Sequence, residues 1–185
     1  MRVIAGIFRS RALDAPAGMN TRPTSDRLRE TLFNVLAPRI MGARFLDLYA
    51  GSGAVGIEAL SRGAARVELV ERAQPALKAL RANLSRLGIA AGVGVQAVSV
   101  AAFLKKAAPA RFDLIFLDPP YDLADEYEQT LGLLPSVLAE DGLVIAEHRR
   151  KDKLAECFGP LVRTRLLEQG DAALSFYGRE LKADS

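Results

Sequence analysis

The segment Asp118-Pro119-Pro120-Tyr121 carries groups suited to chemistry on an aromatic amine. The exocyclic amine of a nucleobase is a poor nucleophile, because its lone pair is delocalised into the ring. The Asp118 carboxylate and the Pro119 carbonyl could each accept one N–H bond, which would hold the amine and favour a pyramidal nitrogen. Pro120 helps to fix the backbone, and Tyr121 could stack on the base. We predict that these four residues are catalytic; a rigid proline turn with a surface tyrosine is the structural alternative.

A glycine-rich loop lies upstream of this segment. Gly51, Gly53 and Gly56 follow an apolar run and open a helical pattern, and their spacing satisfies a dinucleotide-binding fingerprint. Glu71 ends the next apolar run, where a carboxylate could accept hydrogen bonds from both ribose hydroxyls of a cofactor. These residues alone leave both a nicotinamide cofactor and S-adenosylmethionine open.

Asp47 favours one of these two cofactors. It lies four residues before Gly51, near the carboxyl end of the preceding apolar run. S-adenosylmethionine carries an ammonium and a sulfonium, whereas a dinucleotide presents a pyrophosphate to such a loop. A carboxylate at this position therefore favours S-adenosylmethionine. The alternative is that Asp47 caps the amides of its own loop.

Alternating strand and helix patterns must position these residues. Strands are expected at 45–49, 67–70, 93–98, 112–117 and 143–147, and helices at 55–62, 75–87, 101–106 and 127–138. This alternation is typical of a doubly wound, mostly parallel sheet. The last segment predicts an antiparallel hairpin, with strands at 161–168 and 172–179. We therefore expect an α/β fold of the Rossmann-like class I methyltransferase type, with a seven-stranded sheet.

The first residues of the chain predict smaller elements. A short strand is expected over 3–8, pairing with the segment near Leu13. The residues Thr24-Ser25-Asp26 could cap a helix that ends just before Pro38.

Composition excludes several classes of protein. No stretch approaches the ~20 uncharged apolar residues that a membrane span needs, and the first residues lack the apolar core of a secretory signal. One cysteine, Cys157, and one histidine, His148, cannot supply a disulfide framework or a Cys/His zinc site. We expect no membrane contact, no metal, a cytoplasmic location and a monomer.

The motifs together resemble the RsmD family of methyltransferases over most of the chain. The family signature is matched by Arg22-Pro23-Thr24-Ser25-Asp26-Arg27-Leu28-Arg29-Glu30 with Phe33-Asn34, and by the glycine loop continued to Ala64. Asp118–Tyr121, Glu147-His148 and the late Tyr177 are also similar to that family. The resemblance implies transfer of a methyl group from S-adenosylmethionine to the N2 amine of one guanine in 16S ribosomal RNA. The implied partner is the ribosomal RNA or a small-subunit assembly particle.

The resemblance also implies a cofactor site. Ser99 departs from the family, whose members often carry Asp or Asn near the adenine of the cofactor. A serine hydroxyl there replaces one hydrogen bond rather than a charge-assisted pair. The expected cofactor-binding residues are Asp47, Tyr49, Gly51, Gly53, Glu71, Arg72, Ser99, Val100 and Asp118.

Positive charge is concentrated at the amino end. Residues 1–29 hold six arginines and two acids, a net charge of +4, whereas the rest of the chain carries −1. Arginine binds phosphate bidentately, so the imbalance favours RNA contact over a merely solvated end. We expect residues 1–23 to form a basic RNA-contacting arm and residues 24–185 the methyltransferase domain. The predicted RNA-binding residues are Arg2, Arg9, Arg11, Arg22, Arg27 and Arg29.

Three other functions stay open at this point. An adenine-N6 methyltransferase would use the same chemistry, but no added target-recognition domain of the usual size is present. A nicotinamide-dependent oxidoreductase would leave Asp118–Tyr121 without a role. A non-catalytic RNA-binding module would be expected to lose Asp47, Glu71 or Asp118, and all three are present. The sequence does not indicate the target nucleotide, nor whether naked RNA or an assembled particle is bound.

Overall fold

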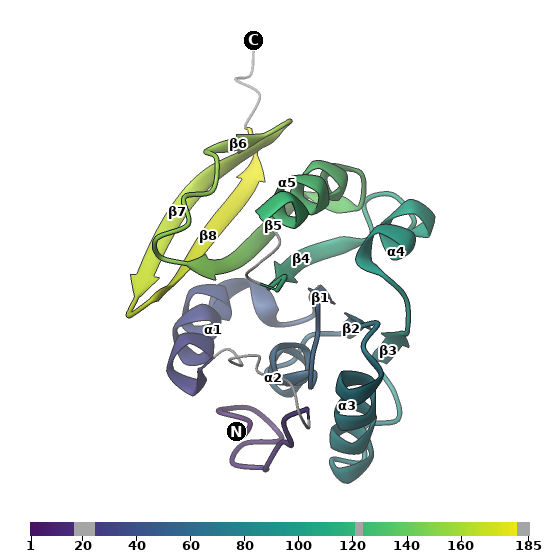
Figure 1. Ribbon diagram of the computed structural model, residues 1–185. Coiled ribbons are helices and arrows are strands. Elements are labelled where there is room, and N and C mark those ends of the chain that lie inside the picture. The colour runs from purple at the N-terminus through teal and green to yellow at the C-terminus, as the bar shows by residue number, and fades with distance from the viewer. Residues whose placement is uncertain (17–24, 121–123, 181–185) are drawn as a thin grey trace.

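The computed structural model describes residues 1–16, 25–120 and 124–180. Figure 1 shows a single twisted sheet with helices on both of its faces. In the described ranges, no helix is long and apolar enough to cross a membrane. In chain order the elements are α1 (Asp26–Ile40), β1 (Arg44–Leu48), α2 (Ala54–Ser61), β2 (Arg66–Val70), α3 (Gln74–Arg86), β3 (Val93–Gln96), α4 (Val100–Lys106), β4 (Phe112–Leu117), α5 (Ala124–Leu133), the 3-10 turn η1 (Leu134–Ser136), β5 (Leu138–Arg149), β6 (Cys157–Phe158), β7 (Leu161–Gln169) and β8 (Ala172–Arg179).

The strand order is β3-β2-β1-β4-β5-β8-β7-β6. The first five strands in this order are parallel, and β8 pairs with β5 and β7 in antiparallel fashion. The doubly wound sheet and the terminal hairpin are therefore confirmed. The predicted count of seven strands is wrong by one within the described residues, because Cys157–Phe158 adds a short edge strand. Two residues are too few to produce a recognisable alternating pattern.

Side chains alternate across the sheet and build two apolar layers. Phe45 on β1 packs with residues of α1, α2 and α3, including Phe33. Its neighbour Leu46 points the other way, into the layer that holds Phe103 of α4 and Leu131 of α5. This period of two follows from strand geometry, and it places α1, α2 and α3 on one face and α4 and α5 on the other. In Figure 1 these two sets of helices lie on opposite sides of the sheet.

Two helix boundaries differ from the prediction. Helix α1 begins as expected, with Ser25 Oγ accepting the Leu28 amide at 3.1 Å, but it continues through Pro38. A proline in the last turn removes only one helical hydrogen bond there, so the helix tolerates it. The helix predicted to run to Leu138 ends at Leu133, because Pro135 lies in a 3-10 turn and Leu138 already begins β5.

The strand predicted over residues 3–8 is wrong. The amino end forms only one antiparallel bridge, between Arg2 and Ala12, so the expected pairing near Leu13 exists in reduced form. Gly6 has a φ of +83°, and a β-carbon there would collide with the backbone carbonyl of Ser61. The chain therefore turns tightly against the end of α2 instead of continuing as a strand. Residues 1–16 are called the strap below.

Candidate active site

Parallel pairing brings four carboxylates to one edge of the sheet. Leu48 of β1 lies opposite Val70 of β2 and Leu117 of β4, and Leu117 lies opposite Ala146 of β5. The residues that follow these positions, Glu71, Asp118 and Glu147, therefore meet at the carboxyl ends of neighbouring strands, and Asp47 lies just before the end of β1. Ligands bind at this edge in open α/β sheets, because the loops diverge there.

The glycine loop joins β1 to α2 at this edge. Gly51 and Gly53 have φ values of +56° and +80°, a region that glycine enters without strain. A β-carbon on Gly51 would meet no atom within 4 Å, so its backbone faces open space. A β-carbon on Gly56 would instead collide with Leu69, so that glycine lets α2 lie close to the sheet. The loop therefore combines an accessible backbone with a tightly packed helix.

Asp47 stabilises the start of α2. Its side chain is 1% exposed, and Oδ2 accepts the Gly56 amide at 2.9 Å. The helix begins at Gly53, which has no side chain to cap it, so Asp47 supplies the missing acceptor from a neighbouring strand. Burial raises the pKa of Asp47 to about 7; the Gly56 bond opposes this shift, and the charge of Glu71 adds to it. The capping role left open by the sequence is therefore present.

Glu71 ties the glycine loop to the turn after β2. Its Oε2 accepts the Gly51 amide at 2.9 Å, and its Oε1 accepts the amides of Arg72 and Ala73, both at 2.7 Å. A carboxylate can accept about four hydrogen bonds, so acceptor capacity remains on a half-buried group beside the open face of Gly51. Arg72 itself is exposed next to it.

The other predicted cofactor residues have structural contacts as well. Tyr49 has a φ of +63°, which is uncommon for a residue with a side chain, and its hydroxyl bonds to Glu126 at 2.8 Å and to Thr130 at 2.7 Å. It therefore fixes α5 to the loop. Ser99 caps α4 by accepting the Ala102 amide at 3.2 Å, and Val100 is buried at the first position of that helix.

Asp118 follows β4 directly and belongs to a group of three carboxylates. Burial raises its pKa well above the ordinary range for aspartate, and the nearby charges of Glu147 and Asp47 raise it further. Pro119 is buried and Pro120 is exposed, while Tyr121 lies outside the described residues. The structure thus brings Asp47 and Asp118 together and gives Asp118 an environment in which a proton is readily held.

Glu147 is the site residue that sequence reasoning missed as a chemical group. It appeared only as part of the family resemblance, yet its side chain is 2% exposed and lies next to Asp118. Its place at the end of the fifth strand, in register with Asp118, was the available signal. The adjacent His148 is a satisfied core histidine, with Nε2 2.9 Å from Ser175 Oγ and Nδ1 2.9 Å from the Arg149 carbonyl. Among the described residues, no group of three or more metal-binding side chains could hold an ion.

One predicted RNA contact is wrong. Arg29 has no exposed surface; its Nη2 donates to the Arg2 carbonyl and, at 3.0 Å, to Asp26 Oδ1. Its Nε lies 3.7 Å from Glu58 Oε2, and Glu58 is equally buried. Arg29 therefore holds α1, α2 and the strap together and cannot reach a phosphate.

The remaining predicted arginines lie in two different places. Arg2, Arg9 and Arg11 are exposed on the strap, and Arg27 is exposed at the start of α1. Arg22 lies outside the described residues. Their contact with RNA stays a prediction.

Comparison with known proteins connects this site to a family. The family described as Conserved hypothetical protein 95 matches residues 1–178. The chain belongs to this family. Ribosomal RNA small subunit methyltransferase D of Escherichia coli (strain K12) is 36% identical over 187 residues, covering 100% of this chain and 93% of that protein. The resemblance to the RsmD family is thereby confirmed.

Solved structures confirm the fold. The protein yhhF from Escherichia coli superimposes with a TM-score of 0.85 at 35% identity, covering 98% of this chain and 99% of that one. The ribosomal protein L11 methylase from Lactobacillus delbrueckii subsp. bulgaricus has a TM-score of 0.67 at 21% identity, covering 83% and 80%. Because that name points to a protein substrate, the shared fold does not decide the target, which must be argued from the site.

Proposed function

We propose that the protein transfers a methyl group from S-adenosylmethionine to the N2 amine of a guanine in small-subunit ribosomal RNA. The observation that carries this proposal is the adjacency of Asp118 and Glu147 at the edge that also holds the glycine loop. The name of the Escherichia coli relative supports ribosomal RNA as the substrate.

The residues around the glycine loop fit S-adenosylmethionine, which supplies a methyl group on a positively charged sulfur when it is bound. The open face of Gly51 gives such a ligand direct access to the backbone. Asp47 offers negative charge near the cationic end, and Glu71 offers acceptor capacity for ribose hydroxyls. Ser99 and Val100 lie at the start of α4, where the adenine is expected.

Asp118 and Pro119 would hold the target amine. The Asp118 carboxylate and the Pro119 carbonyl each accept one N–H, which aligns the nitrogen lone pair toward the methyl donor. As the new N–C bond forms, the amine nitrogen becomes acidic and one of its protons passes to Asp118. The raised pKa of Asp118 suits this role, since a carboxylate in this environment takes up a proton more readily than one in water.

Glu147 favours guanine over adenine as the base. The Watson–Crick edge of guanine presents the N1–H donor beside its N2 amine, whereas adenine presents an N1 acceptor beside its N6 amine. Two neighbouring carboxylates complement two adjacent donors, and a carboxylate facing the N1 acceptor of adenine would be repelled. Glu147 thus accepts the guanine N1–H while Asp118 accepts the amine.

The test is transfer of labelled methyl groups to 16S ribosomal RNA from cells that lack this protein, followed by nucleoside analysis. We expect N2-methylguanosine; N6-methyladenosine would contradict the assignment of the base, and no incorporation into RNA or particles would contradict the proposal as a whole.

A Glu147→Gln variant sharpens the choice of base. It should lose about tenfold or more in kcat/KM on guanine, the cost of one hydrogen bond to a charged group. Removing the Glu147 charge should also lower the pKa of Asp118, so the pH–rate profile should extend to lower pH. An unchanged profile and an unchanged rate would remove Glu147 from the site.

A further inference from the structure

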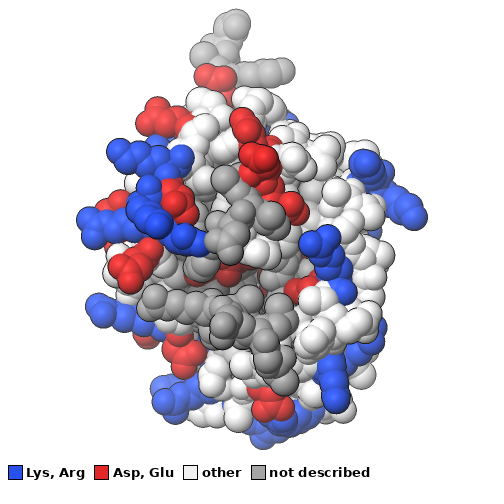
Figure 2. Space-filling view, viewed as in Figure 1, with Lys and Arg blue, Asp and Glu red and all other residues white. Residues whose placement is uncertain are grey.

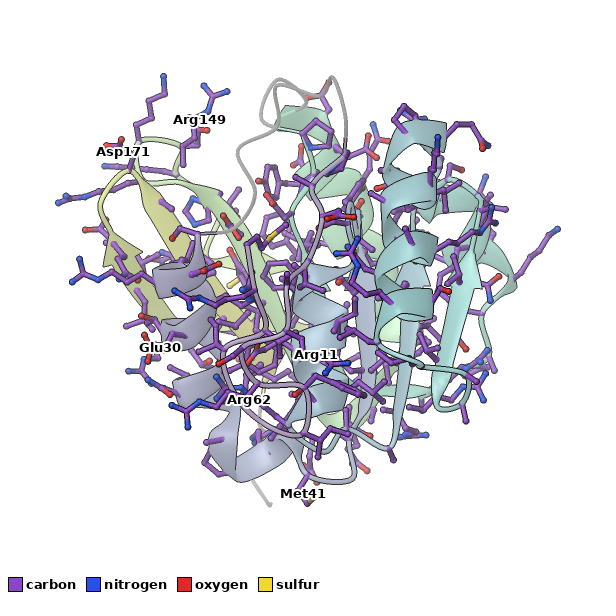
Figure 3. All side chains as sticks on the ribbon, turned by 90° about the horizontal axis from the view of Figure 1, so that it is seen from below. Arg11, Glu30, Met41, Arg62, Arg149 and Asp171 are labelled. Atoms are coloured by element: carbon purple, nitrogen blue, oxygen red, sulfur yellow. The ribbon has the colours of Figure 1, made fainter. Side chains whose placement is uncertain are left out.

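A cavity of about 820 Å³ opens beside the carboxylates, on the face of the sheet covered by α1. Three segments line it: the start of α1 from Ser25 to Leu28, the end of β5 with its following turn from Glu147 to Lys151, and the β7–β8 turn from Gln169 to Ala172. We call it the hairpin cleft. Figure 3 shows Arg149 and Asp171, one from each of the last two segments, at the same edge of the molecule.

We propose that the hairpin cleft binds the sugar-phosphate backbone of the substrate RNA next to the target base. This inference rests on the proposed function, because it takes RNA as the substrate, and it adds the surface on which the RNA lies. Four cations line the cleft, namely Arg27, Arg149, Arg150 and Lys151, against two carboxylates, Glu147 and Asp171. An excess of positive charge in a concave surface attracts phosphate.

The charges are arranged with a direction. Glu147, which adjoins Asp118, lies at the active-site end of the cleft, and Arg149 follows two residues later. Two residues of strand span about 7 Å, so negative and positive groups are separated along the cleft. A nucleotide whose base edge meets Glu147 would therefore place its phosphates among the cations.

The surface ion pairs around the cleft are weak competitors for a phosphate. Arg150 Nε lies 3.1 Å from Glu168 Oε2, with side chains 60% and 42% exposed, and Arg149 Nε lies 3.9 Å from Asp152 Oδ2. Exposed pairs of this kind contribute only about 0–1 kcal/mol, so a phosphate can replace the carboxylate partner. Figure 2 shows acidic and basic side chains interspersed on the side where Figure 1 places β7 and β8.

Hydrogen bonds hold the three walls of the cleft in place. The Arg150 amide donates to the Asp171 carbonyl at 2.8 Å, which joins the turn after β5 to the β7–β8 turn. Thr31 of α1 donates from Oγ1 to Gln169 Oε1 at 3.0 Å, which joins the helix to the same turn. A cleft fixed in this way binds a backbone with little cost in ordering. The amino end of α1 adds the positive end of a helix dipole at one wall.

The test compares Arg150→Ala/Lys151→Ala with the control Lys105→Ala/Lys106→Ala. The control removes the same charge from the end of α4, whose side chains pack on the other face of the sheet. Binding of both variants to purified 16S ribosomal RNA is measured over a range of salt concentrations. The cleft variant should bind at least about tenfold more weakly and lose roughly one unit of salt slope per cation, while the control stays within about twofold. Equal behaviour of the two variants, or no RNA binding by the wild type, would overturn the proposal.

Further measurements separate this proposal from its neighbours. Thermal unfolding of both variants verifies that they are folded. If the wild type binds RNA through the cleft but transfers no methyl group, the proposed function fails and the cleft survives. A cleft variant that loses binding only to assembled small-subunit particles, and not to naked RNA, would assign the cleft to a ribosomal protein and contradict the proposal. During methylation, the defect of the cleft variant should appear in KM for RNA.

Discussion

Two groups of buried charge lie at opposite ends of α2, and they are built in opposite ways. At the carboxyl end of the helix, Glu58 has no exposed surface and meets Arg62 at 2.7 Å and Arg29 at 3.7 Å. The amides of Ile4 and Ala5 donate to its two oxygens at 2.7 and 3.0 Å. Every charge in this group has a partner of opposite sign or a hydrogen bond, so the group fastens the strap to the helix.

At the amino end of α2, charges of the same sign are brought together. Asp47, Asp118 and Glu147 approach one another closely enough for the other two charges to raise the pKa of Asp118. Folding gains nothing from such repulsion, and groups of this kind are typical of functional sites. The helix of 8 residues is about 12 Å long, so the structural group and the chemical group are close but separate. The comparison therefore assigns catalysis to one end of α2 and stability to the other.

The largest expected effect is on catalysis, from Asp118→Ala. Losing one positioned acid–base or electrostatic group should slow the chemical step by about 10²–10⁴-fold. Stability should not fall, because the substitution removes a carboxylate that burial and like charges disfavour. Single-turnover methylation at saturating cofactor, together with denaturant unfolding, measures both quantities. A fully active variant would break the assignment of chemistry to this end of α2.

The second prediction contrasts two arginines that are two residues apart on α1. Arg29→Ala should reduce the free energy of unfolding by about 3–5 kcal/mol, since it breaks a buried ion pair and leaves Glu58 with one cation fewer. Arg27→Ala should leave unfolding almost unchanged and should weaken RNA binding a few-fold, because Arg27 is exposed in the hairpin cleft. Urea titrations and RNA binding on both variants give the comparison. The reverse pattern would show that Arg29 contacts RNA after all.

These two arginines also show where sequence reasoning succeeds and fails. Asp47, Gly51, Glu71 and Asp118 were predicted from their places after apolar runs, and parallel pairing alone suffices to bring them to one edge. Arg29 was misassigned because its partner Glu58 lies on another helix, and no spacing rule connects the two.

Contacts between elements explain the other misses. The short strand at Cys157–Phe158 exists only because β7 offers it an edge, and the strap turns at Gly6 because Ser61 blocks a straight path. The hairpin cleft combines three segments that are distant in the chain, so its charges could be counted in the sequence but not placed together. Local patterns define elements and catalytic motifs, whereas buried ion pairs and clefts depend on packing.

The third prediction concerns the effect of pH on stability at the carboxylate end. The folded pKa of Asp47, about 7, lies above the ordinary value of 3.8, so the folded protein binds this proton more tightly than the unfolded chain. The contribution of Asp47 to stability is therefore complete below about pH 4 and is lost as the pH rises through 7, at a cost of up to about 4 kcal/mol.

The matched variant for this effect is Asp47→Asn. Its side-chain oxygen can still accept the Gly56 amide, but it does not titrate. The free energy of unfolding, measured from pH 4 to pH 8, should fall less steeply in this variant than in the wild type. Identical slopes would mean that Asp47 stays charged in the folded protein.

The smallest expected effect comes from the strap. The Ile7 and Phe8 amides bond to Ser61 at the end of α2 away from the glycine loop, so neighbouring Arg9 and Arg11 lie far from the target base. In Figure 3, Arg11 lies away from the edge that carries Arg149. An Arg9→Ala/Arg11→Ala variant should bind full-length 16S ribosomal RNA only about threefold more weakly, with a salt slope reduced by up to one unit per arginine. A short RNA fragment around the target should bind this variant as well as the wild type, whereas Arg150→Ala/Lys151→Ala should weaken binding of both RNAs. A strap variant that loses the short fragment as strongly as the cleft variant does would place the strap beside the base and remove the distinction between the two ends of α2.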